Sequence, residues 1–320
     1  MKSKMGIAST SYMGVWKPKD TYEFLEHCYA LGAAGIQAGV HGDIAGEAST
    51  RADVSRIGKR AEQLGMFVEA MVVMPNGSDT TAFEQALKDA HQVGASALRA
   101  ACLGTRRYES FATLEAWQQH VKFSHESIKA AVPLLEKYKI PLGLENHKDW
   151  TADEMANLMK KHSSEYFGVC LDFGNNISLL DDPMDAITKL APYTVTTHLK
   201  NMAVDDDRGG FRMSEVLPTD GYLDLPRAME LVSQARPKTH WLLETITRDP
   251  LKVPCLGDKY WASFPDRNGL DLARTLRFID EHKSAKPLPQ ISHLSHEQQL
   301  KTEDQNVIDW LYYAQENLSL

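Results

Sequence analysis

Short apolar runs alternate with longer segments of helical spacing along most of the chain. A compact apolar or β-branched run followed by turn residues predicts a strand buried on both faces, as a parallel sheet requires. The segments between the runs place apolar residues three or four positions apart, which predicts amphipathic helices. The pattern predicts eight strands, at residues 5–10, 35–39, 66–73, 96–103, 141–146, 167–172, 195–201 and 240–245.

Helix boundary signals fit between these strands. Thr151 is a predicted N-cap with Glu154 three residues on, the pattern of a capping box. Gly32, Gly65 and Gly94 follow helical segments and are predicted C-caps. Eight repeats of strand, loop and helix predict an α/β fold, a (β/α)8 TIM barrel.

The barrel is expected to occupy residues 1–283, and residues 284–320 are expected to form a helical C-terminal extension. A proline-containing break precedes an acidic and aromatic segment at 297–315. Two roles stay open for this extension. It packs on the flank of its own barrel, or it forms a subunit contact in a homo-oligomer.

A metal-binding residue type ends each of the last four predicted strands: Glu145, Asp172, His198 and Glu244. The carboxyl ends of barrel strands converge on one pocket, which is where active sites of this architecture lie. We therefore predict one site built from these four side chains. The alternative is that they form internal salt bridges or caps.

Three carboxylates and one imidazole are a donor set for a single divalent cation, with Mn²⁺ expected and Mg²⁺, Co²⁺ or Zn²⁺ as alternatives. Such an ion retains positions for two adjacent oxygens of a hydroxyketone or diol and stabilises an enediolate. Glu145 and Glu244 are the candidate acid and base residues. No nucleotide cofactor is expected.

Two nearby residues share strand faces with these ligands and are candidate substrate contacts. His147 follows Glu145 by two positions, and Lys200 follows His198 by two, so period-two alternation points each pair the same way. The alternative for His147 is a loop histidine that caps a backbone group. For Lys200 it is a salt bridge to Asp172 or Glu145.

Further candidate substrate contacts follow other strands. Asn175 is either a substrate or supporting residue, or a turn residue; Trp16 and His41 follow the first two strands at the same end of the barrel. The long segment 247–265 follows strand eight and is expected to overhang the pocket mouth, with Trp261 among its aromatic residues.

Composition narrows the possible partners. The 320 residues carry a formal charge of −8 and a pI near 5.8, which argues against a nucleic-acid partner. No apolar run approaches the roughly 18 residues of a membrane span, and the first strand begins too early for a secretory apolar core, so we expect a cytoplasmic protein with no membrane partner. The four cysteines are scattered without a Cys-x-x-Cys pair, which suggests neither disulfides nor a thiolate metal site.

Four segments resemble the metal-binding segments of the xylose isomerase-like TIM barrel superfamily: Leu144-Glu145-Asn146-His147, Leu171-Asp172-Phe173-Gly174-Asn175, Thr197-His198-Leu199-Lys200 and Leu243-Glu244-Thr245. The resemblance covers roughly residues 5–283. The arrangement is similar to the sugar phosphate isomerase/epimerase group that includes D-tagatose 3-epimerase and inosose dehydratase. It implies that the four residues hold the ion and that Glu145 and Glu244 exchange protons.

The resemblance implies a metal-dependent isomerase or epimerase that acts on a sugar or keto-sugar. A lyase or dehydratase of keto-sugars on the same site, including β-elimination from 3-keto-glycosides, is the alternative, and a non-catalytic sugar-binding barrel is a third hypothesis. Ketose 3-epimerases tend to have a histidine where this chain has Asn175 and an arginine where it has Val204. These departures weaken a direct assignment as a ketohexose 3-epimerase.

Overall fold

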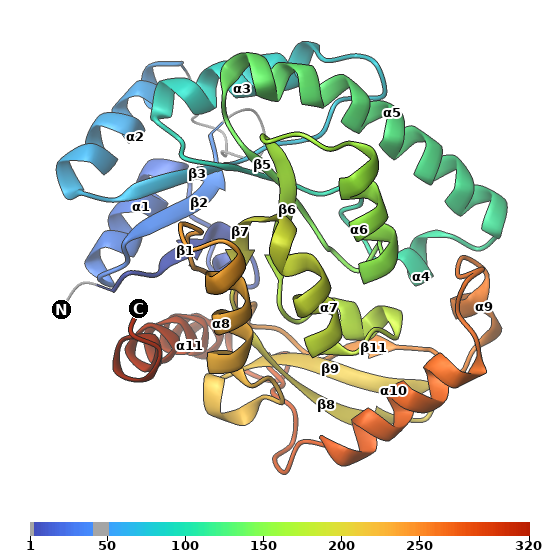
Figure 1. The fold of residues 1–320 in the computed structure, drawn as a ribbon. Helices are drawn as coiled ribbons and strands as arrows, with labels where there is room; N and C mark the ends of the chain where they lie inside the picture. The colour runs from blue at the N-terminus through green and yellow to red at the C-terminus, as the bar shows by residue number, and fades with distance from the viewer. Residues whose placement is uncertain (1–2, 41–50) are drawn as a thin grey trace.

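The computed structural model describes residues 3–40 and 51–320. Eight parallel strands form the central sheet in the order β10-β1-β2-β3-β4-β5-β6-β7. Parallel bridges Thr196↔His240 and Leu199↔Leu243 join the two outer strands, so the sheet closes into a barrel (Figure 1). These strands are β1 (Gly6–Ala8), β2 (Gly35–Gly39), β3 (Phe67–Met71), β4 (Leu98–Ala100), β5 (Leu142–Glu145), β6 (Phe167–Asp172), β7 (Thr194–His198) and β10 (Leu242–Leu243).

A helix follows each barrel strand in the chain, and all of these helices except the last, α10, cover the outside of the barrel (Figure 1). The (β/α)8 barrel predicted from the sequence is thus confirmed, although most strands are shorter than expected. These helices are α1 (Thr21–Ala30), α2 (Arg51–Leu64), α3 (Thr81–Val93), α5 (Leu114–Tyr138), α6 (Ala152–Lys161), α7 (Pro183–Leu190), α8 (Leu225–Ala235) and α10 (Gly269–Glu281). Short 3₁₀ segments and two one-turn helices, α4 (Arg107–Ser110) and α9 (Asp258–Trp261), lie in the loops.

The predicted helix boundaries are confirmed where a local signal marks them. Thr151 and Glu154 form a reciprocal capping box at the start of α6. Gly32, Gly65 and Gly94 each have a positive φ, the left-handed conformation that glycine adopts at low cost after a helix. These signals act within one turn of chain and therefore need no tertiary context.

A second, antiparallel sheet lies outside the barrel and was not predicted. β8 (Asn201–Asp207) and β9 (Gly210–Val216) form a hairpin, and β11 (Leu251–Val253) pairs with β9. Figure 1 shows this sheet beside α10, below the barrel in that view. Phe211, Tyr260 and Phe264 belong to a separate hydrophobic core between this sheet, α10 and the loops.

The C-terminal extension contains α11 (His296–Asn317), which lies beside the barrel near α8 (Figure 1). Trp310 is fully buried, and its indole Nε1 donates to the backbone oxygen of Val216 at 3.0 Å. The buried carboxylate of Glu303 accepts from the backbone N–H groups of Val15 at 2.8 Å and Trp16 at 2.6 Å. The helix therefore fastens the loop that follows β1.

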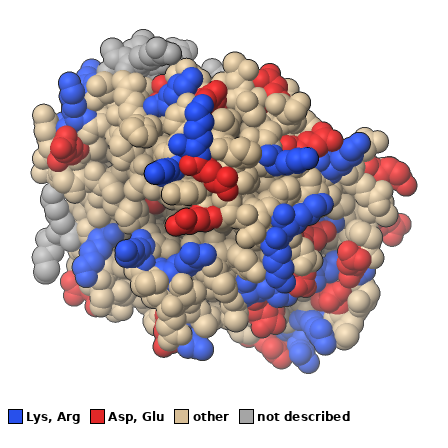
Figure 2. Space-filling model, turned by 45° about the horizontal axis from the view of Figure 1, so that its top comes forward, with Lys and Arg blue, Asp and Glu red and all other residues tan. Residues whose placement is uncertain are grey.

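Basic and acidic side chains are interspersed on the face drawn in Figure 2, and no broad surface of one sign covers it. In residues 3–40 and 51–320, no helix is both long enough and apolar enough to cross a bilayer.

Candidate metal centre

Four side chains converge at the carboxyl ends of neighbouring barrel strands. Glu145 ends β5, Asp172 ends β6, His198 ends β7 and Glu244 directly follows β10. One donor atom of each lies within 4.8 Å of the donor atoms of the others. All four residues are at most 3% exposed. The structure thus brings together the four residues that the sequence analysis selected.

Register explains why these residues meet. Asp172 is the direct neighbour of His198 between β6 and β7, and Glu145 pairs with Cys170 one strand earlier. The backbone N–H of Glu244 donates to the backbone oxygen of Leu199 at 3.1 Å. This bond aligns Glu244, just after β10, with the end of β7, where His198 lies. Parallel pairing therefore places the strand ends around one point.

His198 presents Nδ1 to this point because its Nε2 is engaged. Nε2 lies 2.7 Å from Oε1 of Gln37, whose amide nitrogen donates to Glu69 at 3.1 Å. This second hydrogen bond turns the amide oxygen of Gln37 toward His198, so Nε2 is the donor. Nδ1 has no hydrogen-bond partner among the described residues and lies 3.4 Å from Glu244 Oε1 and 3.5 Å from Glu145 Oε2. A lone pair that faces carboxylates requires a proton or a cation between them.

Asp172 is oriented by a local turn. Its Oδ1 accepts from the N–H groups of Gly174 at 2.9 Å and Asn175 at 3.0 Å. The Asn146 side chain bonds both the N–H and the carbonyl of Asp172, each at 2.8 Å. Oδ2 is thereby left for the centre, 3.8 Å from His198 Nδ1.

Two cations support the carboxylates, the partly buried Arg99 and the buried Lys200. Arg99 Nε donates to Glu145 Oε2 at 2.5 Å. Lys200 Nζ pairs with Glu244 Oε2 and lies 2.6 Å from Asp172 Oδ2. Two cations against three carboxylates leave one excess negative charge in a buried place, which favours a further cation.

Protons compete for this centre. Burial opposes a charge on His198, but Cys170, Glu244 and Glu145 together raise its pKa well above the ordinary value. Burial raises the pKa of the Cys170 thiol itself to about 11, so at neutral pH the carboxylates supply the attraction. Burial, reinforced by the two glutamates and opposed by Lys200, raises the pKa of Asp172 to about 7.

The two glutamates are held ionised. Burial alone would raise their pKa values, but Arg99 and His198 lower the pKa of Glu145, and His198 and Lys200 lower that of Glu244 well below its usual range. The donor set therefore fits a hard or borderline divalent ion, which would replace the protons on His198 and Asp172.

Three of the expected substrate contacts lie beside the centre. Lys200 touches Glu244 and Asp172, so the predicted alternative of a salt bridge to Asp172 is confirmed. His147 Nδ1 bonds the backbone oxygen of Leu103 at 2.9 Å, and burial lowers its pKa to about 4, so the neutral ring retains Nε2 as an acceptor. Asn175 Nδ2 donates to Glu145 Oε1 at 3.4 Å.

The aromatic candidates have other contacts. Trp16 packs against Tyr12 and His27, and Trp261 Nε1 donates to the Cys255 carbonyl at 2.9 Å. Neither indole hydrogen-bonds the four central residues within the described parts of the chain. His41 lies outside the described residues. Neighbouring Tyr260 and Phe264, two further aromatic residues of the segment expected to overhang the pocket mouth, are buried in the second core.

Sequence reasoning missed several polar residues that complete the centre: Gln37, Glu69, Arg99 and Lys148. The first three lie inside strands β2, β3 and β4, where the surrounding run is apolar. A charged or amide side chain within such a run was a usable signal, because a buried polar group needs a partner. Its partner, however, depends on barrel register.

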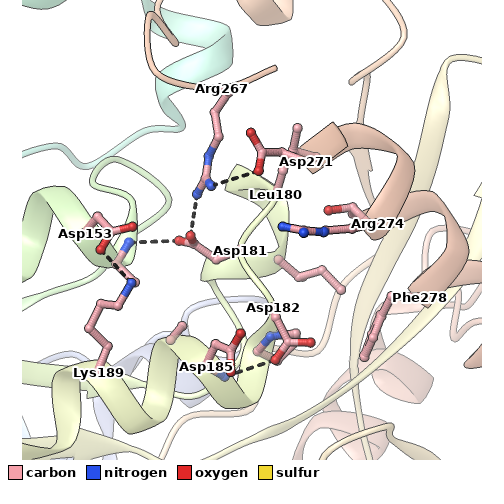
Figure 3. Close-up of a pocket in the computed structure, with 15 residues that line it drawn as sticks. Asp153, Leu180, Asp181, Asp182, Asp185, Lys189, Arg267, Asp271, Arg274 and Phe278 are labelled. Atoms are coloured by element: carbon pink, nitrogen blue, oxygen red, sulfur yellow. Dashed lines mark hydrogen bonds and ion pairs between the residues drawn. The ribbon is translucent and has the colours of Figure 1, made fainter. Parts of the chain in front are cut away.

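A separate cavity of about 260 Å³ lies between α6, α7 and α10 (Figure 3). Arg267 pairs there with Asp181, and Lys189 lies 2.5 Å from Asp153. None of the four central residues lines this cavity.

The fold and the position of the polar residues place the protein among the α/β barrels whose functional residues lie at the carboxyl ends of the strands. Residues 25–282 match the family described as "Xylose isomerase-like TIM barrel", and the chain belongs to that family.

Among curated proteins, the 3-oxo-isoapionate decarboxylase of Pectobacterium atrosepticum is 31% identical over 99 residues, which cover 30% of this chain and 36% of that protein. The match therefore spans about a third of that relative.

Two solved structures share the fold. The IolI protein with a bound zinc atom superposes with a TM-score of 0.59 at 12% identity, over 97% of this chain and 98% of that chain. The 3-keto-D-glucoside 4-epimerase YcjR from Escherichia coli superposes with a TM-score of 0.58 at 13% identity, over 87% of this chain and 100% of that chain.

Proposed function

We propose that the protein is an enzyme, a divalent-metal-dependent isomerase or epimerase of a sugar or keto-sugar. The observation that carries the proposal is the convergence of Glu145, Asp172, His198 and Glu244. His198 Nδ1 faces carboxylates and has no hydrogen-bond partner in the part of the chain that the structure describes. These four residues would hold one ion. Mn²⁺ is the expected ion, with Mg²⁺, Co²⁺ or Zn²⁺ as alternatives.

When bound, the ion would supply Lewis-acid stabilisation of charge on a substrate oxygen. Glu145 and Glu244 would move the proton between carbon atoms. Both carboxylates have a lowered pKa and are ionised at neutral pH, as a base requires. Lys200 would donate a hydrogen bond to a developing oxyanion, and the free Nε2 of His147 would accept one from a substrate hydroxyl.

Family membership supports this reading, because the superposed YcjR is named as a 3-keto-D-glucoside 4-epimerase. A lyase on the same site is the second candidate function. The observation that favours it is the match to a protein named as a decarboxylase. Each reaction passes through an enolate-type anion. In the isomerase and in β-elimination the anion forms by loss of a proton, which then either returns to carbon or is followed by departure of a leaving group. In decarboxylation the anion forms by loss of carbon dioxide and then takes up a proton.

The experiment incubates Mn²⁺-loaded protein in D₂O with a panel of ketoses and 3-keto-sugars, and follows deuterium uptake by NMR. Uptake with a rearranged or epimerised sugar supports the isomerase, whereas loss of a carbon dioxide or glycosyl group supports the lyase. Glu244→Gln is expected to keep the fold and lose at least about 10²-fold in rate. Full activity of Glu244→Gln would exclude its role in proton transfer.

A further inference from the structure

Lys148 is a buried cation without an acidic hydrogen-bond partner beside the candidate centre. Only 4% of its surface is exposed. Its Nζ donates to the amide oxygen of Asn175, a neutral group, and no carboxylate lies within ion-pair distance in the described structure. A buried ammonium group normally pairs with an anion or loses its charge. One of its three donors is engaged by a partner among residues 3–40 and 51–320, which leaves two that a ligand could use.

The surrounding cations are already paired. Arg248 Nη2 binds the buried Glu215 at 2.6 Å, Lys200 binds Asp172 and Glu244, and Arg99 binds Glu145. Arg248 and Glu215 also wall a cavity of about 190 Å³ next to Thr245. Among these four cations, Lys148 therefore differs in that its hydrogen-bond partner in the described structure, Asn175, is neutral.

The net charge of the groups around Lys148 indicates that the ligand of Lys148 is an anion. Five buried carboxylates, at Glu69, Glu145, Asp172, Glu215 and Glu244, face the four cations Arg99, Lys148, Lys200 and Arg248, so the group carries one excess negative charge, which a divalent ion would turn into one excess positive charge. A divalent ion adds two positive charges to a buried volume, where uncompensated charge is costly. An anionic substrate would reduce that excess, whereas a neutral sugar would not.

We propose that Lys148, positioned by Asn175, binds a carboxylate of the substrate, so that the substrate is a sugar acid or keto acid rather than a neutral sugar. This inference rests on the proposed function and specifies its substrate class. Burial, together with Lys200 and Arg248, lowers the pKa of Lys148 to about 8, and the ammonium group remains mostly charged at neutral pH. Asn175 connects the site to the centre through its hydrogen bond to Glu145.

The backbone of Lys148 supports a dedicated role for this position. Its φ is 60°, a left-handed conformation that a lysine adopts at a cost. Lys139 has a similar φ of 55°, but it is an exposed helix C-cap. It is therefore a control for replacing a lysine in this conformation.

The test measures binding of erythronate and of its neutral counterpart erythritol by isothermal titration calorimetry, with and without Mn²⁺. The proteins are wild type, Lys148→Met, Lys148→Arg and the control Lys139→Met. Loss of a charge-assisted hydrogen bond is expected to weaken erythronate binding by roughly ten- to a hundredfold in Lys148→Met and to leave erythritol unchanged. Lys148→Arg should recover part of the affinity, and Lys139→Met should behave as wild type.

Thermal melting of each variant shows whether a protein that binds erythronate more weakly is still folded. Equal erythronate affinity in wild type and Lys148→Met would overturn the carboxylate site and leave the proposed function standing. Failure of wild type to bind Mn²⁺ would overturn the proposed function, while the metal-free titrations would still test Lys148. An equal loss for erythronate and erythritol in a folded Lys148→Met protein would also overturn the proposal, because it would show a general packing role.

Discussion

Single residues at the centre depend on partners one layer farther from the candidate ion. Gln37 fixes which nitrogen of His198 carries the proton, and Glu69 in turn fixes the orientation of Gln37. Thr196 Oγ1 and His240 Nδ1 complete the hydrogen bonds of Glu69, at 2.6 Å and 3.0 Å. The histidine is therefore oriented by a buried chain that crosses the barrel interior. Replacement of such a supporting residue typically lowers metal affinity by about ten- to a hundredfold.

Gln37→Leu is expected to weaken binding of Mn²⁺ by about ten- to a hundredfold, because it removes the acceptor that holds His198. Isothermal titration calorimetry measures the affinity, and the visible spectrum of the Co²⁺ form reports a change in ligand geometry. Thr196→Val is the control, since it removes a hydrogen bond from Glu69 and leaves Gln37 in place. Unchanged affinity and spectrum in Gln37→Leu would contradict the positioning role.

Asp149 is expected to make stability depend on pH. Burial raises its pKa to about 7, and one of its oxygens has no hydrogen-bond partner among the described residues. The unfolded chain releases this proton near pH 4, whereas the folded protein retains it until about pH 7. The contribution of Asp149 is therefore greatest at low pH and declines as the pH rises from about 4 to about 7.

Urea unfolding at pH 5 and pH 8 measures this effect. Asp149→Asn should gain on the order of a few kcal/mol relative to wild type between these two values, because the amide cannot ionise. Asp153→Asn removes a nearby exposed carboxylate and should change the free energy of unfolding by under about 0.5 kcal/mol at both. A parallel pH dependence of wild type and Asp149→Asn would show that Asp149 ionises normally.

Elements differ in how far the sequence determines them. The barrel strands and the capping box at Thr151 were predictable, because apolar runs and caps are local signals. β8 was not, because its segment Asn201–Asp207 ends in three aspartates and resembles a loop. It is a strand because β9 pairs with it along its whole length, a contact that sequence spacing does not reveal.

The centre shows the same division between local and tertiary information. Its four strand-end residues were predictable as donor types that follow apolar runs. Arg99 was not, since its role depends on the alignment of β4 beside β5. Lys148 was not, because its burial results from loop packing.

Trp310 is the element-scale test of α11. Trp310→Ala should lower the free energy of unfolding by about 3–5 kcal/mol, because it removes a fully buried aromatic side chain and its hydrogen bond to Val216. Tyr312→Ala is the control on the same helix, since Tyr312 is 66% exposed. Denaturant unfolding measures both, and a small effect of Trp310→Ala would mean that α11 contributes little to the stability of the fold.

At the scale of the whole molecule, barrel closure brings together candidate metal ligands that are far apart in the chain. β7 and β10 complete the ring. Glu215 on β9, which lies between them in sequence, pairs with Arg248 from the segment after β10 and adds to the charges around the centre. The centre is thus a property of the closed barrel. An ion held by four strands should therefore stabilise the folded state as a whole, since an unfolded chain offers no assembled site.

Addition of Mn²⁺ to metal-free protein is expected to raise the melting temperature, with a gain of about 2.7 kcal/mol at a free ion concentration one hundred times the dissociation constant. The gain should be smaller at pH 6 than at pH 8, because binding must displace protons from Asp172, whose pKa is about 7, and from His198. Differential scanning calorimetry with a Mn²⁺ titration measures it. His198→Ala should lose most of the Mn²⁺-induced rise in melting temperature. His293→Ala, which replaces an exposed histidine of the C-terminal segment, should retain that rise. A gain that persists in His198→Ala would mean that the ion stabilises the protein from a different site.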